Sequence, residues 1–207
     1  MCGINGIINV SDSNINLRDN IIDMNIQLKH RGPDDNGFWI DSAQRIALGH
    51  TRLSILDLSS AGHQPMQDND TDNTIIFNGE IYNFQYLNRN FLEDEIFNSS
   101  SDTETILKLY RKLGLDMLRH LNGMFAFAIW DSTKEELILA RDRSGKKPLY
   151  YTKMNGFFSF SSELKALFKL PWVSKKIDNT VMYDFLTYNS VATPNSMFKG
   201  ISKFKPG

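Results

Sequence analysis

The single cysteine of this 207-residue chain stands at position 2, directly after the initiator methionine. Removal of Met1 would leave Cys2 with a free α-amine beside its thiol. The ordinary pKa values, about 8.5 for a thiol and about 7.7–8.0 for an α-amine, make that amine a suitable base near neutral pH. A nucleophile and its base on one residue is the arrangement of N-terminal-nucleophile catalysis. The alternative is a small, buried residue in a strand, which is common for a free cysteine.

Four further residues have side chains or backbone groups that could serve such a nucleophile. Asn78 and Gly79 could supply N–H donors for an oxyanion hole, although Asn-Gly is also an ordinary hairpin turn. Arg52 could hold a carboxylate through two parallel hydrogen bonds, or it could be a solvated charge on a strand. Asp102 begins an expected helix, where the helix dipole alone explains an acidic residue. None of these signals is decisive by itself.

Short strands and helices alternate along the chain and would position these residues. Apolar, β-rich segments predict strands over residues 3–10, 46–54, 74–77, 124–130, 136–141, 148–153 and 157–161. Apolar periodicity predicts helices over residues 17–28, 101–113, 162–170 and 177–188. Ser101 and Glu104 predict a capping box at the start of the second helix. The four strands between residues 124 and 161 predict one antiparallel meander.

Composition excludes several classes of protein. Lys and Arg total 23 and Asp and Glu total 24, so a net charge of −1 gives no support for binding nucleic acid or an anionic membrane. The chain has no run of about 18 apolar residues and no basic region typical of a signal peptide, so we expect a cytoplasmic protein. One cysteine excludes an intramolecular disulfide, and four scattered histidines predict no metal site.

The remaining candidates are the four histidines and two charged pairs, namely His30, His50, His63, His120, Arg141-Asp142 and Lys146-Lys147. Any histidine could act as the base of a cysteine–histidine pair, but structural or loop roles are expected for all four. The charged pairs could indicate a phosphate site. A solvated or ion-paired hairpin is the favoured interpretation of both pairs.

A series of short motifs spans nearly the whole chain. They are MCGI (1–4), HRGPD (30–34), HTRLSI (50–55), GHQPM (62–66), FNGEIYN (77–83), SDTE (101–104), GMFAF (123–127), RDRSG (141–145), KPLYY (147–151) and SSELKAL (161–167). In this order they resemble the class II glutamine amidotransferase domain, most closely the N-terminal domain of glutamine-hydrolysing asparagine synthetases. The motifs at 62–66 and 77–83 favour the asparagine synthetase branch. Ser100 stands where the family often has glycine.

The resemblance implies an α+β fold, a four-layer α-β-β-α sandwich of two antiparallel sheets of the N-terminal-nucleophile hydrolase type. It also implies hydrolysis of L-glutamine to glutamate and ammonia through a thioester on Cys2, with the α-amine of that residue as the base. Such an enzyme would belong to asparagine and amino-acid biosynthesis.

The resemblance further implies a role for each candidate. Asn78 and the backbone N–H of Gly79 correspond to the oxyanion hole. Arg52 corresponds to the group that binds the substrate α-carboxylate. Glu80 and Asp102 correspond to the acceptors for its α-ammonium group. The same pocket would be lined by backbone groups of Leu53, Ser54, Ile55 and Leu56.

The implied domain organisation is a glutaminase domain over residues 1–190 and a linker over 191–207 into an ATP-dependent synthetase domain absent from this chain. ATP, Mg²⁺ and the ammonia acceptor would belong to that domain, and no cofactor or metal is expected here. The expected partners are L-glutamine and the synthetase domain, with a homodimer left open. Two alternatives are the same glutaminase serving another carboxylate acceptor, as in amidation of surface-polysaccharide sugars, and a glutamine-binding domain without turnover.

Overall fold

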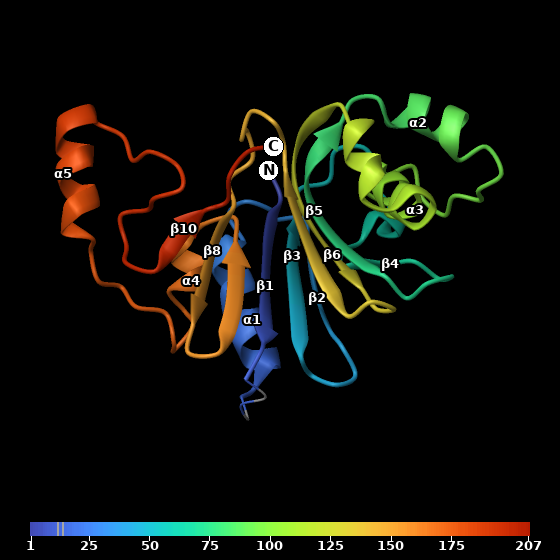
Figure 1. Ribbon diagram of the computed structural model, residues 1–207. Coiled ribbons are helices and arrows are strands. Elements are labelled where there is room, and N and C mark those ends of the chain that lie inside the picture. Colours follow the sequence, from blue (N-terminus) through green and yellow to red (C-terminus); the bar gives the residue numbers. More distant parts are fainter. Residues whose placement is uncertain (12, 14) are drawn as a thin grey trace.

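The computed structural model describes residues 1–11, 13 and 15–207, which form two antiparallel sheets placed face to face (Figure 1). Sheet A contains, in spatial order, β10 (Ile201–Lys203), β8 (Tyr150–Met154), β9 (Phe157–Ser161), β1 (Gly3–Asn9), β3 (Ile46–Arg52) and β2 (Asp35–Ile40). Sheet B contains β4 (Met66–Gln67), β5 (Thr74–Ile81), β6 (Gly123–Asp131) and β7 (Glu136–Arg141). The predicted α+β class with two antiparallel sheets is confirmed.

Helices cover the outer face of each sheet, which completes the four predicted layers. The helices α1 (Leu17–Leu28) and α4 (Leu164–Leu167) pack on sheet A. The helices α2 (Phe84–Phe91) and α3 (Asp102–Leu113) pack on sheet B (Figure 1). Short 3₁₀ helices follow at Ser60–Gly62 and Gly114–Arg119. No helix among the described residues is both long and apolar enough to cross a membrane.

The alternation of side chains along β1 explains why this strand lies at the centre of the fold. Ile4 points between the sheets, where it joins Phe160 of sheet A and Ile76 of sheet B in one buried cluster. Ile7, on the opposite face of β1, packs with the α1 layer. This period of two is the pattern of a strand that is buried on both faces. The start of β1 therefore fixes the position of Cys2.

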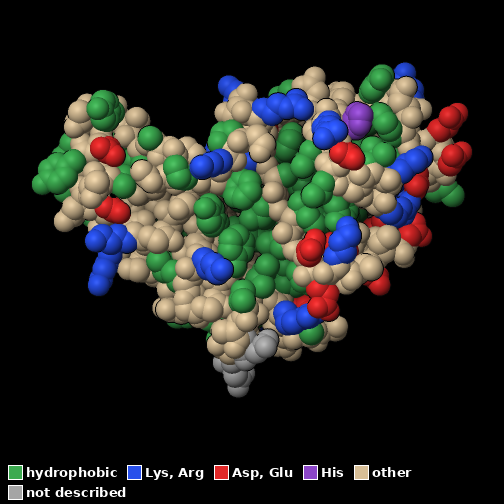
Figure 2. Space-filling view, in the orientation of Figure 1, with side chains coloured by type: hydrophobic (Ala, Val, Ile, Leu, Met, Phe, Trp, Pro, Cys, Tyr) green, Lys and Arg blue, Asp and Glu red, His purple; other side chains and the backbone are tan. Residues whose placement is uncertain are grey.

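The last segment of the chain is divided between a projecting helix and a sheet strand. Helix α5 (Asn179–Tyr188) lies apart from both sheets, and Figure 2 shows hydrophobic side chains on this projecting part. Beyond it, β10 pairs antiparallel with β8 and becomes an edge strand of sheet A. The proposed domain boundary at residue 190 stays a prediction.

Two predictions about the strands are wrong, and pairing explains both. Asn78-Gly79 is not a turn, because β5 continues through it, with Asn78 opposite Ala126 and Gly79 opposite Phe125 in β6. The four strands after residue 123 are not one meander. The hairpin β6–β7 belongs to sheet B and the hairpin β8–β9 to sheet A, so residues 142–149 cross from one sheet to the other. No prediction from the sequence covered the strands β2, β4 and β10 or the helix α2.

The start of α3 is held differently from the predicted capping box. Ser101 is the N-cap, since its hydroxyl oxygen accepts a hydrogen bond from the Thr103 N–H at 3.1 Å. The Glu104 carboxylate, however, accepts from the backbone N–H groups of Asn98 and Ser99 at 2.9 and 2.8 Å. Glu104 thus ties down the loop before the helix rather than the N-cap residue itself.

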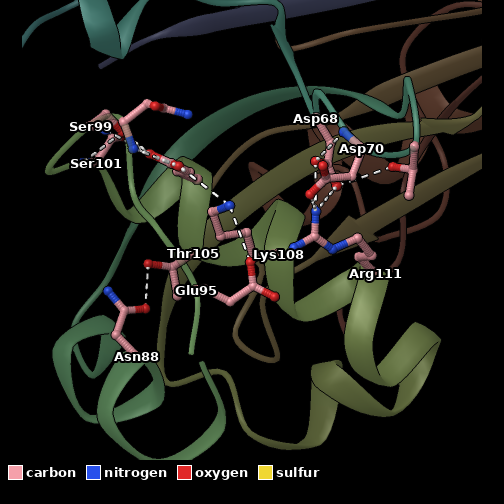
Figure 3. A network of polar contacts seen from close by, with 12 residues as sticks. Asp68, Asp70, Asn88, Glu95, Ser99, Ser101, Thr105, Lys108 and Arg111 are labelled. Atoms are coloured by element: carbon pink, nitrogen blue, oxygen red, sulfur yellow. Dashed lines mark hydrogen bonds and ion pairs between the residues drawn. The ribbon is translucent and has the colours of Figure 1, made fainter. Parts of the chain in front are cut away.

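A network of polar contacts anchors the rest of α3 (Figure 3). Arg111 pairs with Asp68 at 3.0 Å, and Lys108 pairs with Glu95 at 3.4 Å. Thr105 donates to Asn88 of α2 at 2.9 Å. These contacts fix α3 against its neighbouring loops, and hence they fix the position of its first residue, Asp102.

Candidate active site

A cavity of about 250 Å³ lies beside the N-terminus, at the ends of strands from both sheets. Its volume is slightly below the usual range for small-molecule pockets, roughly 300–1,000 Å³. Predicted site residues that line it are Cys2, Arg52, Leu53, Ile55, Leu56, Asn78, Gly79, Glu80 and Asp102. Ser54 is the exception among the predicted residues. It lines a different cavity, and its N–H donates to Asp34 at 2.8 Å.

The Cys2 thiol is held between the two backbone groups of Leu53. The Leu53 N–H donates to Sγ at 3.4 Å, and the thiol donates to the Leu53 carbonyl oxygen at 3.6 Å. Burial raises the pKa of Cys2, while the Leu53 N–H and nearby positive charges act to lower it. The thiol therefore keeps its proton near neutral pH unless a base removes it.

The backbone groups of Cys2 are constrained at both its nitrogen and its carbonyl oxygen. Met1 lines the cavity, and burial lowers the pKa of its amine. While Met1 is attached, the Cys2 nitrogen is a peptide nitrogen that cannot accept a proton. On the other side, the Cys2 carbonyl oxygen accepts from Arg31 Nε at 2.9 Å. Arg31 is itself paired with Glu163 at 2.8 Å, so the backbone of Cys2 is rigidly placed.

The side-chain amide of Asn78 is buried, and the residue lines the cavity. Only 1% of Asn78 is exposed, and neither Oδ1 nor Nδ2 has a hydrogen-bond partner among the described residues. An unsatisfied buried polar group costs about 1–3 kcal/mol, so such groups normally have a reason to exist. Among the described residues, no protein group therefore competes for either atom, and the residue itself lines the cavity.

The backbone just before Asn78 is fixed by two buried side chains. Gln64 accepts from the Phe77 N–H at 2.7 Å, and His50 Nε2 lies 3.1 Å from the Phe77 carbonyl oxygen, to which it donates. Burial lowers the pKa of His50 to about 3, so the ring is neutral at physiological pH. His50 positions the strand and is not placed to act on the thiol.

Arg52 is the last residue of β3, and not all of its guanidinium N–H groups are used in hydrogen bonds with the described residues. Its Nη1 donates to the Ser59 carbonyl oxygen at 2.9 Å, and its Nη2 donates to the Asp57 carbonyl oxygen. A guanidinium group has five N–H donors, so several stay available for a ligand carboxylate.

The loop that Arg52 holds is tied across the cavity to the loop before α3. The Asp57 carboxylate accepts from the Ser100 N–H at 2.9 Å and from its hydroxyl at 3.2 Å. Hydrogen bonds from Ser59 and Ser100 lower the pKa of Asp57 to about 2. At Ser100, where the family often has glycine, the hydroxyl thus adds a contact that glycine would lack.

Two carboxylates, Asp102 and Glu80, lie in the cavity wall. Asp102 is 4% exposed, and its Oδ2 accepts from the Ile81 N–H at 2.8 Å. Burial raises the pKa of Asp102 to about 6, and the charge of Glu80 acts in the same direction. A carboxylate whose ionised form is this poorly stabilised would gain from a bound cation.

Asp102→Asn is expected to increase the free energy of unfolding at pH 8, by up to about 3 kcal/mol. The pKa of Asp102 rises from 3.8 to about 6 on folding, and each unit corresponds to about 1.4 kcal/mol. The folded state binds the Asp102 proton more tightly than the unfolded state does. The contribution of this proton to the free energy of unfolding is therefore complete below about pH 4 and is lost as the pH rises through about 6. Asparagine can still accept the hydrogen bond from Ile81.

Urea unfolding of wild type and Asp102→Asn at pH 5 and pH 8 measures this effect. The exposed Asp94→Asn variant removes the same charge outside the pocket and should follow the wild type. A lower free energy of unfolding for Asp102→Asn at pH 8 would show that the ionised Asp102 carboxylate does not destabilise the folded state.

None of the four histidines lines this cavity. His30 pairs with Glu163 at 3.0 Å, and His63 pairs with Asp35 at 2.7 Å. His120 packs against the Phe91 ring at a centroid distance of 4.7 Å. These contacts agree with the structural roles expected from the sequence.

The interpretation of residues 141–147 as a solvated or ion-paired hairpin is wrong. Asp142 is buried, and it accepts backbone hydrogen bonds from Phe125, Ser144, Lys146 and Lys147 at 3.2, 3.1, 2.8 and 3.0 Å. Lys147 is buried too and lines the cavity with Cys2. Sequence reasoning missed Lys147 as a cavity residue, although the apolar pair Pro148-Leu149 directly after it was a signal. In the described part of the chain, no three potential ligand side chains are placed to hold a metal ion.

Known structures and sequences define the class of this protein. Glutamine phosphoribosylpyrophosphate amidotransferase of Bacillus subtilis superposes with a TM-score of 0.68 over 80% of this chain and 42% of that chain, at 22% identity. The two chains therefore share their fold. The sequence profile of the glutamine amidotransferase domain matches residues 1–207, and the chain belongs to that family.

Two relatives are considerably longer than this chain. A Methanocaldococcus jannaschii protein, provisionally named a glutamine-hydrolysing asparagine synthetase, is 42% identical over 99% of this chain and 42% of its own length. Asparagine synthetase (glutamine-hydrolysing) 3 of Bacillus subtilis is 37% identical over 100% of this chain and 34% of its own length. The chain thus spans less than half of each relative.

Proposed function

We propose that this domain hydrolyses L-glutamine to glutamate and ammonia in the Cys2 cavity, once Met1 has been removed. The observation that carries the proposal is the side chain of Asn78. Its amide is buried and has no hydrogen-bond partner among the described residues, and Asn78 lines the same cavity as Cys2, the only cysteine of the chain. A donor kept free in this way is what a developing oxyanion requires.

Free glutamine is a zwitterion, and the cavity has charges to match. The spare donors of Arg52 would bind the α-carboxylate, while Glu80 and Asp102 would accept from the α-ammonium group. Backbone groups of Leu53, Ile55 and Leu56 would line the same pocket. Held at both charged ends, the substrate would present its side-chain amide to Cys2.

The proposed reaction has two halves. The α-amine of Cys2 takes the thiol proton, and the thiolate attacks the amide carbon to form a tetrahedral intermediate. Asn78 Nδ2–H and the Gly79 N–H stabilise its oxyanion. Collapse transfers the proton to the leaving nitrogen, so ammonia departs and a thioester stays on Cys2. Water, deprotonated by the same amine, then attacks the thioester and releases glutamate.

In a longer protein, this ammonia would be used by a following ATP-dependent asparagine synthetase domain. The names and lengths of the two relatives support this assignment. Residues 1–190 would then be the glutaminase domain and 191–207 the linker. ATP and Mg²⁺ would be bound by the synthetase domain.

The test is product release by protein whose N-terminus is known. Intact mass separates Met1-free from Met1-containing protein, and each is incubated with glutamine. We expect equal amounts of glutamate and ammonia from the Met1-free form. The matched control carries an N-terminal extension that leaves Cys2 in a peptide bond, and it should release neither. Glutamine binding to Met1-free protein without release of either product would contradict the proposal.

A further inference from the structure

The side chain of Lys147 is mostly buried, and its ammonium group has no ion-pair partner among the described residues. Lys147 is 6% exposed and lines the cavity with Cys2. Within the described part of the chain, its ammonium group takes part in none of the hydrogen bonds or ion pairs. A buried charge is costly unless something compensates it, so its position calls for an explanation.

The backbone of the 142–147 loop holds Lys147 in place. The Asp142 carboxylate accepts from the Lys147 N–H at 3.0 Å, and Arg141 Nε donates to the Lys147 carbonyl oxygen at 2.6 Å. Although burial acts to raise it, the pKa of Asp142 is lowered by the N–H groups that surround its carboxylate. The loop therefore presents the lysine stem to the cavity from a fixed backbone.

Charges around the thiol come from several elements. The charged groups that act on Cys2 or Lys147 are the N-terminal amine, Arg31, Arg52, Glu80 and Asp142, and Asp34 acts on the amine. The two arginines are already engaged, Arg31 with Glu163 and Arg52 with backbone carbonyls. Burial lowers the pKa of Lys147, whereas a negative charge on Cys2 raises it. Among the described residues no partner takes a hydrogen bond from the Lys147 ammonium group, whereas both guanidinium groups are oriented by the contacts above and the spare donors of Arg52 serve the ligand carboxylate.

We propose that the Lys147 ammonium group stabilises the thiolate of Cys2, and so makes Lys147 a further functional residue of this active site. The inference rests on the proposed glutaminase function. The thiol proton still goes to the Cys2 α-amine, and Lys147 neither gains nor loses a proton. Its fixed charge favours the anionic sulfur in a site from which most water is excluded.

The test uses Met1-free protein and three variants. Lys147→Met removes the charge and keeps a stem of similar length, and Lys147→Arg keeps the charge. Lys146→Met removes the charge of the exposed neighbour as a matched control. The main readout is the rate of Cys2 alkylation by iodoacetamide as a function of pH, which follows the thiolate without any substrate.

We expect Lys147→Met to move the alkylation midpoint upward by about one pH unit, a typical effect of losing one nearby opposite charge. At pH 7 its kcat/KM for glutamine should fall about tenfold, mainly through kcat. Lys147→Arg and Lys146→Met should keep the wild-type midpoint. If Lys147→Met is poorly folded, Lys147→Gln replaces it.

An unchanged midpoint in a folded Lys147→Met variant would overturn the inference, even if wild type turns over glutamine. Conversely, a shifted midpoint in protein that never releases glutamate would overturn the glutaminase function and leave the Lys147–thiolate interaction in place. The two failures are therefore distinguishable.

Discussion

Cys2→Ala is expected to lower kcat for glutamine hydrolysis by more than about 10³-fold, because without the sulfur no thioester can form. The alanine variant should bind glutamine almost as wild type does, since the proposed contacts to the α-groups come from Arg52, Glu80 and Asp102. Release of glutamate and ammonia, together with calorimetric binding of glutamine, measures the two effects separately.

Cys2→Ser is the matched control for this prediction. Serine at position 2 also permits loss of Met1 and keeps the α-amine, but its hydroxyl is a much weaker nucleophile. We expect residual turnover at or above the alanine level and far below wild type. Turnover that persists in Cys2→Ala would rule out Cys2 as the nucleophile.

Asn78→Ala is expected to lower kcat by about 10²–10³-fold, with little change in KM, which is the usual cost of removing one oxyanion-hole donor. The fold should tolerate the change. Neither polar atom of the Asn78 side chain has a partner among the described residues, so its removal leaves no protein group unsatisfied. Steady-state kinetics and urea unfolding of the same preparation check both parts.

Gln64→Ala is the control for Asn78→Ala, because Gln64 lines the same cavity but both its amide oxygen and its amide nitrogen have protein partners. It accepts from the Phe77 N–H at 2.7 Å and donates to Thr103 at 3.1 Å. Its loss should destabilise the fold by about 1–3 kcal/mol, since a buried N–H is left unpaired. If Asn78→Ala instead loses stability and keeps its kcat, the unpartnered amide has no role in catalysis.

Local pattern predicted most of the fold because its signals are strong at the ends of elements. The helix predicted over residues 17–28 matches α1 at both ends. Asn16 caps its first turn by accepting a hydrogen bond from the Asp19 N–H at 3.1 Å. Asn78-Gly79 was mispredicted as a turn because the pairing with β6 overrides the local preference of the two residues. Sheet membership of the hairpins could not be predicted, since it depends on the loop over 142–149.

In the candidate site too, local motifs predicted some residues, while the placement of others depends on contacts between residues far apart in the sequence. Residue types and motifs predicted the thiol, the Asn78 amide and the Arg52 cation as members of one site. The sequence could not show that Ser54 lies outside that cavity or that Lys147 lies inside it. Both placements depend on loops held by distant carboxylates, Asp34 in the first case and Asp142 in the second.

The central claim is a thioester formed on Cys2 of the Met1-free chain, and rapid-quench mass spectrometry tests it most directly. Met1-free protein is mixed with glutamine, quenched in acid within milliseconds and digested for peptide analysis. The account predicts an N-terminal peptide that begins at Cys2 and carries a glutamyl group on its sulfur, and it predicts no such adduct in the N-terminally extended protein. Glutamate release by protein that retains Met1, or turnover by Met1-free protein with the adduct on another residue, would contradict it.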